Sequence, residues 1–145
     1  MEDQELLKEK IEQGFLPCFN HACERRESCL HWLGRVYVST NSWVVECINP
    51  ANPEACGNSC VMYRHHQKVR MARGFTGLLG RMPRNMGQEL MREMKATCHR
   101  TYAYEYRNGS RPMPPRMQDS ITATCRRLGY DGDVTFDRYE EDYEW

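Results

Sequence analysis

Six of the eight cysteines lie between residues 15 and 60, and their types and spacing predict a metal site. They follow the pattern C-x4-C-x5-C-x17-C-x8-C-x3-C and are Cys18, Cys23, Cys29, Cys47, Cys56 and Cys60. A tetrahedral zinc ion takes four thiolate or imidazole ligands at about 2.0–2.3 Å, commonly from close pairs that the fold brings together. We therefore predict a zinc site formed by Cys18, Cys23, Cys29 and Cys60, with Cys56, Cys47 and His21 in reserve.

Local geometry favours this set. A C-x3-C pair on a helix has its two side chains one turn apart and about 40° around the axis, so both sulfurs can point the same way. Cys56 and Cys60 have this spacing. Cys18 and Cys23 flank a short loop that is irregular enough to direct both sulfurs inward, and Cys29 follows on the next predicted helix.

Three other interpretations of the cysteines stay open. The C-x2-C spacing of zinc ribbons and thioredoxin-like sites is absent. Four cysteines can also hold an iron–sulfur cluster, free thiols can serve as small buried apolar residues, and an even number of cysteines can form disulfides. The N-terminal segment MEDQELLKEKIEQGF has no features of a signal peptide, so we expect a cytosolic protein with reduced thiols.

Two histidines lie inside the cysteine cluster. His21 or His31 could replace a cysteine ligand, and together with the six cysteines they would provide eight donors, enough for two zinc ions. His65 and His66 are poorer candidates, because on a helix continuous with Cys56 they would face away from a metal bound there.

Around these residues the N-terminal half predicts short elements joined by loops. Residues 2–13 and Glu24–Leu33 have helical patterns of apolar residues. Val36–Val38 and Trp43–Ile48 carry β-branched and aromatic residues that predict two strands. Residues 49–53 contain two prolines and predict a loop.

The C-terminal half predicts mostly helix. The expected elements are a helix over Met62–Arg73, a flexible link through Gly74, Gly77 and Gly80, helices over 85–106 and 115–128, and a short final helix from Thr135. Cys98 and Cys125 fall on the apolar stripes of two of these helices, so we expect them in the core rather than at a metal.

Length and composition set the fold class. A chain of 145 residues with 40% hydrophobic and 28% charged residues is long enough for one core and too apolar to be disordered. No apolar run approaches the roughly 20 residues of a membrane helix. We predict a mainly α fold, with α+β possible: a compact helical domain over 1–145 with a loop-rich, metal-binding subregion at 15–64, a small two-stranded element and a helical subregion at 84–145.

Charge is distributed unevenly although the net charge is zero. Residues 64–116 contain 12 basic and 3 acidic side chains, whereas residues 131–145 contain 1 and 7. Arginine outnumbers lysine by 16 to 4, which favours bidentate contacts with carboxylates or phosphates. The acidic tail could also fold back and neutralise the basic segment. We expect a macromolecular partner, a protein in preference to nucleic acid, with no membrane and no identified small-molecule substrate.

No catalytic constellation emerges. Gly74, Gly77 and Gly80 are not followed by the Lys-Ser/Thr of a phosphate-binding loop. The clustered C-terminal carboxylates suggest a solvated face rather than an acid–base pair. We therefore expect a non-enzymatic protein, unless an iron–sulfur cluster supplies redox chemistry.

Two segments resemble known families. Residues 121–139, ITATCRRLGYDGDVTFDRY, resemble the second helix-turn-helix of AraC-type regulators, which would imply nucleic-acid binding. Residues 17–30 and 136–145 together resemble short bacterial proteins of Bacteroides type that are classed only as a domain of unknown function. The second resemblance implies a bacterial intracellular protein and no activity. The sequence thus predicts a zinc-binding regulatory or adaptor module with an Arg-rich surface, with an iron–sulfur redox protein or a nucleic-acid-binding regulator as alternatives.

Overall fold

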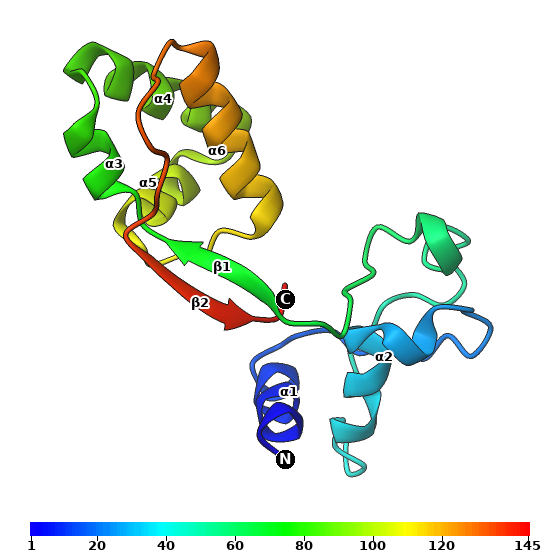
Figure 1. Cartoon of the computed structure of the whole chain (residues 1–145). Coiled ribbons are helices and arrows are strands. Elements are labelled where there is room, and N and C mark those ends of the chain that lie inside the picture. Colours follow the sequence, from blue (N-terminus) through cyan, green and yellow to red (C-terminus); the bar gives the residue numbers. More distant parts are fainter. The chain divides into compact units, whose positions relative to one another are not determined.

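The computed structural model describes residues 1–145, and the chain forms two compact units (Figure 1). The cysteine-rich unit comprises Met1–Gln67 and Tyr143–Trp145, and the helical unit comprises Lys68–Asp142. Six helices and one two-stranded antiparallel sheet confirm the predicted mainly α fold with a small β element. No helix has both the length and the apolar character needed to cross a membrane.

The cysteine-rich unit has little regular structure. Helix α1 spans Glu2–Glu12 and helix α2 spans Leu30–Gly34. Single 3-10 turns cover Arg26–Ser28, Arg35–Tyr37 and Gly57–Ser59. The two helices approach closely at Gly34, where a Cβ atom would lie 2.7 Å from Cδ1 of Ile11. The remainder is held by turns and isolated backbone hydrogen bonds, as the loop-rich sequence predicts.

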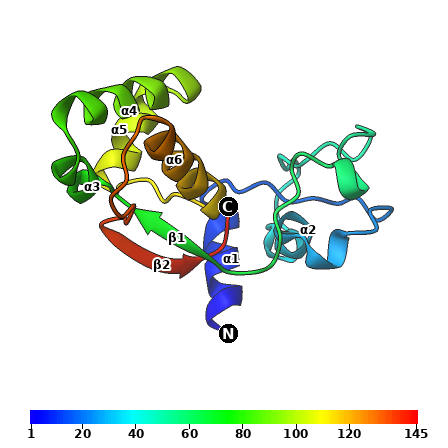
Figure 2. The ribbon, with the colours of Figure 1, turned by 45° about the horizontal axis from the view of Figure 1, so that its top comes forward.

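The helical unit holds the larger apolar core. Its elements are β1 (Val69–Arg73), α3 (Thr76–Arg81), α4 (Arg84–Thr97), α5 (Arg100–Asn108), α6 (Pro115–Arg127) and β2 (Arg138–Asp142). The strands run side by side in both views of the ribbon (Figures 1 and 2). The largest fully buried side chains of this unit come from five segments and are Phe75, Leu78, Leu90, Met113, Ile121 and Cys125.

The two strands do not lie where the sequence places them. Val36–Val38 overlaps a 3-10 turn, and in the Trp43–Ile48 segment only Ile48 forms a strand-like bridge, to Cys18. The Trp43 side chain is 101% exposed, so it makes none of the packing contacts through which aromatic residues stabilise strands. The sheet instead pairs β1 with β2, and Nε of Arg73 lies 2.5 Å from a carboxylate oxygen of Glu140.

Several helix boundaries also differ from the predictions. The helix predicted over Met62–Arg73 is wrong, because its second half is strand β1 and the preceding residues are irregular. The helix predicted over Glu24–Leu33 is broken at Cys29, whose backbone is extended. The segment predicted as a flexible glycine-containing link forms helix α3 instead. The carboxylate of Asp137, in the loop before β2, caps this helix.

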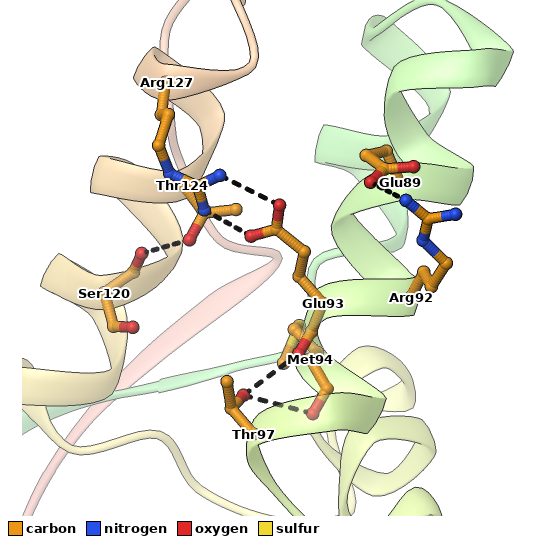
Figure 3. A network of polar contacts seen from close by, with 8 residues as sticks. All are labelled: Glu89, Arg92, Glu93, Met94, Thr97, Ser120, Thr124 and Arg127. Atoms are coloured by element: carbon orange, nitrogen blue, oxygen red, sulfur yellow. Dashed lines mark hydrogen bonds and ion pairs between the residues drawn. The ribbon is translucent and has the colours of Figure 1, made fainter.

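The helix predicted over 85–106 is two helices. Thr97 Oγ1 donates to the carbonyls of Glu93 and Met94 at 3.1 and 3.2 Å (Figure 3). Cys98 Sγ also donates to the Met94 carbonyl at 3.0 Å, so side chains satisfy the last carbonyls of α4. The backbone at Cys98 is extended, and the His99 side chain then accepts from Thr101 N–H to begin α5. Local polar side chains therefore interrupt an otherwise continuous apolar stripe.

The predicted final helix is wrong, and the helix-turn-helix hypothesis with it. Helix α6 ends at Arg127, close to the predicted boundary at 128. The following residues 131–137 are irregular, and Arg138–Asp142 forms strand β2 in place of a helix. Without a second helix this segment has no recognition helix to place in a DNA groove.

Candidate functional site

Backbone hydrogen bonds bring the cysteine-bearing segments of the cysteine-rich unit together. Cys18 N–H donates to the His31 carbonyl at 2.9 Å, and Ile48 N–H donates to the Pro17 carbonyl at 3.0 Å. Leu30 N–H donates to the Arg64 carbonyl at 2.8 Å, as part of a bridge between Cys29 and the segment just after Cys60. Segments that are distant in sequence therefore lie next to one another without forming a sheet.

These segments border a small cavity that is lined by the four cysteines predicted as ligands. Cys18, Cys23, Cys29 and Cys60 all contribute to its wall. The first three are buried, with at most 9% of each residue exposed, and Cys60 is partly buried. The cavity volume is about 20 Å³, and a cavity needs about 10–15 Å³ to hold one water molecule. The space therefore suits one small ion rather than an organic ligand.

Backbone amides are directed at two of the sulfurs. Gly57 N–H donates to Cys23 Sγ at 3.4 Å, and the Asn20 amide donates to the Cys18 sulfur. Burial raises the pKa of the Cys18 thiol, the Asn20 amide opposes the rise, and the neighbouring Cys29, Cys23 and Cys60 add to it. Amide donors favour the thiolate form, which is the form that binds metals.

His31 lines the same cavity and is 4% exposed. Its Nδ1 lies 2.5 Å from the Leu16 carbonyl oxygen, and its ring stacks on Phe15 with centroids 4.2 Å apart. Burial lowers the pKa of His31, and the carbonyl groups of Leu16 and Met62 oppose this effect. Its Nε2 is fully buried and forms no hydrogen bond of normal geometry. A buried nitrogen without a partner is costly, so it calls for an explanation.

The reserve ligands lie outside this cavity wall. Cys56 is partly buried and interacts with Cys23 from outside the wall. Cys47 is partly buried next to Ile48 and does not contribute to the wall. His21 is exposed, with its ring edge-on to Trp32 at 4.9 Å. Of the predicted and reserve residues, the structure therefore gathers the four preferred cysteines and leaves the other three at the periphery.

The described side-chain positions do not form a completed metal centre. In them, no group of three or more His, Cys, Asp or Glu side chains is arranged to hold a metal ion. All eight cysteines are free thiols, and Cys98 and Cys125 lie in the helical unit, packed against or within its core. The backbone amides of Asn20 and Gly57, which donate to cysteine sulfurs, were not predicted from the sequence, because such contacts depend on loop conformation.

In the helical unit, the carboxylates of the basic segment 64–116 are already paired. Glu89 pairs with Arg92, and Glu93 forms a two-point ion pair with Arg127 that joins α4 to α6 (Figure 3). The third carboxylate, Glu105, pairs with Arg111 at 2.7 Å. None of these three carboxylates forms an ion pair with Arg84, Lys95, Arg100 or Arg107.

A family model described as "Family of unknown function (DUF6078)" matches residues 1–145. The chain belongs to this family. The DUF6078 match spans both compact units, and it confirms the family of unknown function inferred from residues 17–30 and 136–145. No curated protein and no solved structure matches this DUF6078 chain.

Proposed function

We propose that the cysteine-rich unit binds one zinc ion through Cys18, Cys23, Cys29 and Cys60, and that the protein is a non-enzymatic regulatory or adaptor module. The observation that carries the metal half of the proposal is that these four cysteines all line one small cavity. A structural zinc ion needs four ligands and no open coordination position, which suits such a cavity. We also propose a cytoplasmic location, since free thiols persist in reducing compartments.

Metal binding would require modest rearrangement. The backbone segments are already juxtaposed, so the sulfurs need to turn toward a shared ion by rotation about their χ1 angles. The cysteine-rich unit has two helices, of which one has only 5 residues, and a small cluster of buried residues around Cys18, Ile48 and Ala55. Zinc would supply the stabilisation that this limited apolar core lacks.

The size of the cavity favours zinc over the iron–sulfur alternative. A single ion occupies one atomic position, whereas the smallest common cluster contains two irons and two sulfides. The small volume of the cavity, about 20 Å³, therefore favours the first.

His31 provides a fifth donor. A metal-ligating histidine usually donates its other ring N–H to a carbonyl or carboxylate, which fixes the tautomer. The Nδ1 contact with the Leu16 carbonyl matches that arrangement, and Nε2 is buried without a hydrogen bond of normal geometry. His31 can therefore replace one cysteine in the ligand set.

The adaptor half of the proposal places partner binding in the helical unit, on its Arg-rich surface. The pairing of all three acidic residues of segment 64–116 with other arginines supports it, because the positive charges of Arg84, Lys95, Arg100 and Arg107 are left for an external partner.

Elemental analysis of reduced, purified full-length protein tests the metal half. Cells grown with both zinc and iron should yield one zinc per chain and no iron or sulfide. Cys18→Ser and Cys60→Ser should lower the zinc content to near zero, whereas the matched variants Cys98→Ser and Cys125→Ser should keep it. Protein without stoichiometric metal, or with iron and sulfide, would refute the zinc assignment.

A further inference from the structure

An open cavity of about 630 Å³ lies in the helical unit between α3, α4 and α5. Its wall includes three cations from two helices, Arg84, Lys95 and Arg107, and no acidic residue. Its apolar part comes from Leu79, together with the buried Met82 and Met91. The volume is within the range of about 300–1,000 Å³ that is typical of ligand sites.

Two cations of the cavity wall, Lys95 and Arg107, share the Tyr104 ring with Arg100, which lies outside the wall. Lys95 Nζ lies 4.7 Å from the centroid of the Tyr104 ring, and the guanidinium carbons of Arg107 and Arg100 lie 4.8 and 5.8 Å from it. Hydrogen bonds from Lys95 and Arg100 lower the pKa of the Tyr104 hydroxyl, as expected where positive charge is concentrated. The ring attracts each cation, but the three like charges repel one another, and a bound anion would reduce this repulsion.

Acidic residues of the same helices do not relieve this repulsion. Glu89, Glu93 and Glu105 are each engaged with a different arginine, as described above and in part in Figure 3. No ion pair involves Arg84, Lys95, Arg100 or Arg107. The cavity therefore combines uncompensated positive charge with an apolar wall.

We propose that this cavity binds an acidic peptide segment of a partner protein, with an apolar side chain seated against Leu79, Met82 and Met91 and carboxylates at Arg84, Lys95 and Arg107. This proposal rests on the adaptor half of the proposed function and names its partner class. Methionine side chains adapt to varied apolar partners, and arginine forms bidentate pairs with carboxylates. Charge complementarity thus selects the partner, and the apolar wall anchors it.

A single-stranded nucleic acid fits the site less well. Such ligands stack their bases on aromatic rings. Tyr104 carries three cations around its ring, and Arg111 lies 3.8 Å from the centroid of Tyr102 and 6.0 Å from that of Tyr106. The tyrosines of this region already serve as platforms for the protein's own cations.

Fluorescence anisotropy with the reduced, purified full-length protein tests the proposal. The probe is a labelled glutamate-rich peptide with a central pair of leucines, and the comparison probes are the same peptide with glutamine for glutamate and a single-stranded oligonucleotide. We expect the acidic peptide to bind with an affinity that falls as salt is raised, and the other two probes to bind at least tenfold more weakly.

Two variants connect binding to this cavity. Neutralising the three cations together, as Arg84→Gln, Lys95→Gln and Arg107→Gln, should weaken peptide binding by about threefold to a hundredfold, since each exposed pair contributes about 1.4- to fivefold. Gly80→Leu leaves the charge unchanged and should also weaken binding, because Gly80 lines the cavity and a Cβ there meets no atom within 4 Å. The control triple variant Arg92→Gln, Arg126→Gln and Arg138→Gln removes the same charge away from the wall and should bind within twofold of the wild type.

Each contrary result overturns the proposal. Equal loss in the control triple variant would mean nonspecific attraction, wild-type affinity in Gly80→Leu would place the peptide elsewhere, and tighter binding of the oligonucleotide would assign the surface to nucleic acid. Circular dichroism of every variant verifies folding. Zinc content measured on the same samples separates the two proposals, because a zinc-loaded protein that ignores the peptide refutes only the peptide site.

Discussion

Replacing Cys18 with serine should unfold the cysteine-rich unit, whereas replacing Cys125 with serine should only weaken the helical unit. Cys18 is 9% exposed at the wall of the small cavity. A structural zinc ion contributes about 10–16 kcal/mol of binding free energy at neutral pH, which is comparable to the whole stability of a typical domain, about 5–15 kcal/mol. The short helices and few buried residues of this unit cannot offset the loss of a ligand.

The effect at Cys125 has a different origin and a smaller size. This residue is 0% exposed in the core of the helical unit, and burial raises the pKa of its thiol. A serine there buries a hydroxyl in place of a weakly polar thiol, which costs about 1–3 kcal/mol. No metal term is involved, so the variant should remain folded and bind zinc normally.

Hydrogen exchange followed by mass spectrometry distinguishes the two effects on the full chain. In Cys18→Ser, peptides from residues 15–66 should exchange at the rate of an unfolded chain while peptides from α4 and α6 keep their protection. In Cys125→Ser the peptides of α4 and α6 should exchange somewhat faster and those of residues 15–66 should be unchanged. Equal and mild effects of the two substitutions on hydrogen exchange would show that Cys18 is not a ligand of a structural metal ion.

Three further predictions concern the helical unit. Asp137 accepts hydrogen bonds from Thr76 and Gly77 N–H at 2.9 Å; burial opposes its ionisation, but these bonds and that of the Thr76 hydroxyl keep its pKa below the ordinary 3.8. Asp137→Ala should therefore lower the free energy of unfolding by about 0.5–2 kcal/mol at neutral pH. In urea titrations, the difference in this free energy between wild type and variant should disappear as the pH falls through the pKa of Asp137 in the folded state. Gly74→Ala should cost more than about 1–2 kcal/mol, because φ is +77° and the new Cβ would lie 2.6 Å from Asp137 Oδ2; a double-mutant cycle with Asp137→Ala should show strong non-additivity. Glu93→Gln should lower the urea midpoint by an amount that shrinks at high salt, and the control Glu89→Gln, which affects a pair within one helix, should change it less.

Helices with local signals were predictable from the sequence. Helix α6 begins at Pro115 and ends two residues before Gly129, whose φ is +94°, so both boundaries are marked in the sequence. Helix α1 likewise ends just before Gly14. In these cases short-range chemistry determines where the element begins and ends.

The sheet was not predictable in this way. Val69 pairs with Asp142 and Arg73 with Arg138, so the partner strands are more than 60 residues apart. β2 is rich in acidic residues that individually disfavour strands, and its pairing depends on contacts such as Arg73 with Glu140. A rule that considers one segment at a time cannot detect such a pair.

The candidate site was partly predictable. The four cysteines predicted as ligands line one cavity, and their binding of a metal ion stays a prediction. The orientation of the His31 ring, which buries Nε2, depends on the contact of Nδ1 with the Leu16 carbonyl, and this contact forms only in the folded chain. The cationic cavity depends on which arginines pair with carboxylates, and only the folded chain determines that choice.

X-ray absorption spectroscopy at the zinc edge of the reduced, purified protein measures the proposed zinc coordination. We expect one zinc per chain with four sulfur neighbours at about 2.3 Å, or three sulfurs and one imidazole nitrogen if His31 replaces a cysteine. Absence of bound zinc, or a zinc ion surrounded only by oxygen and nitrogen, would contradict it.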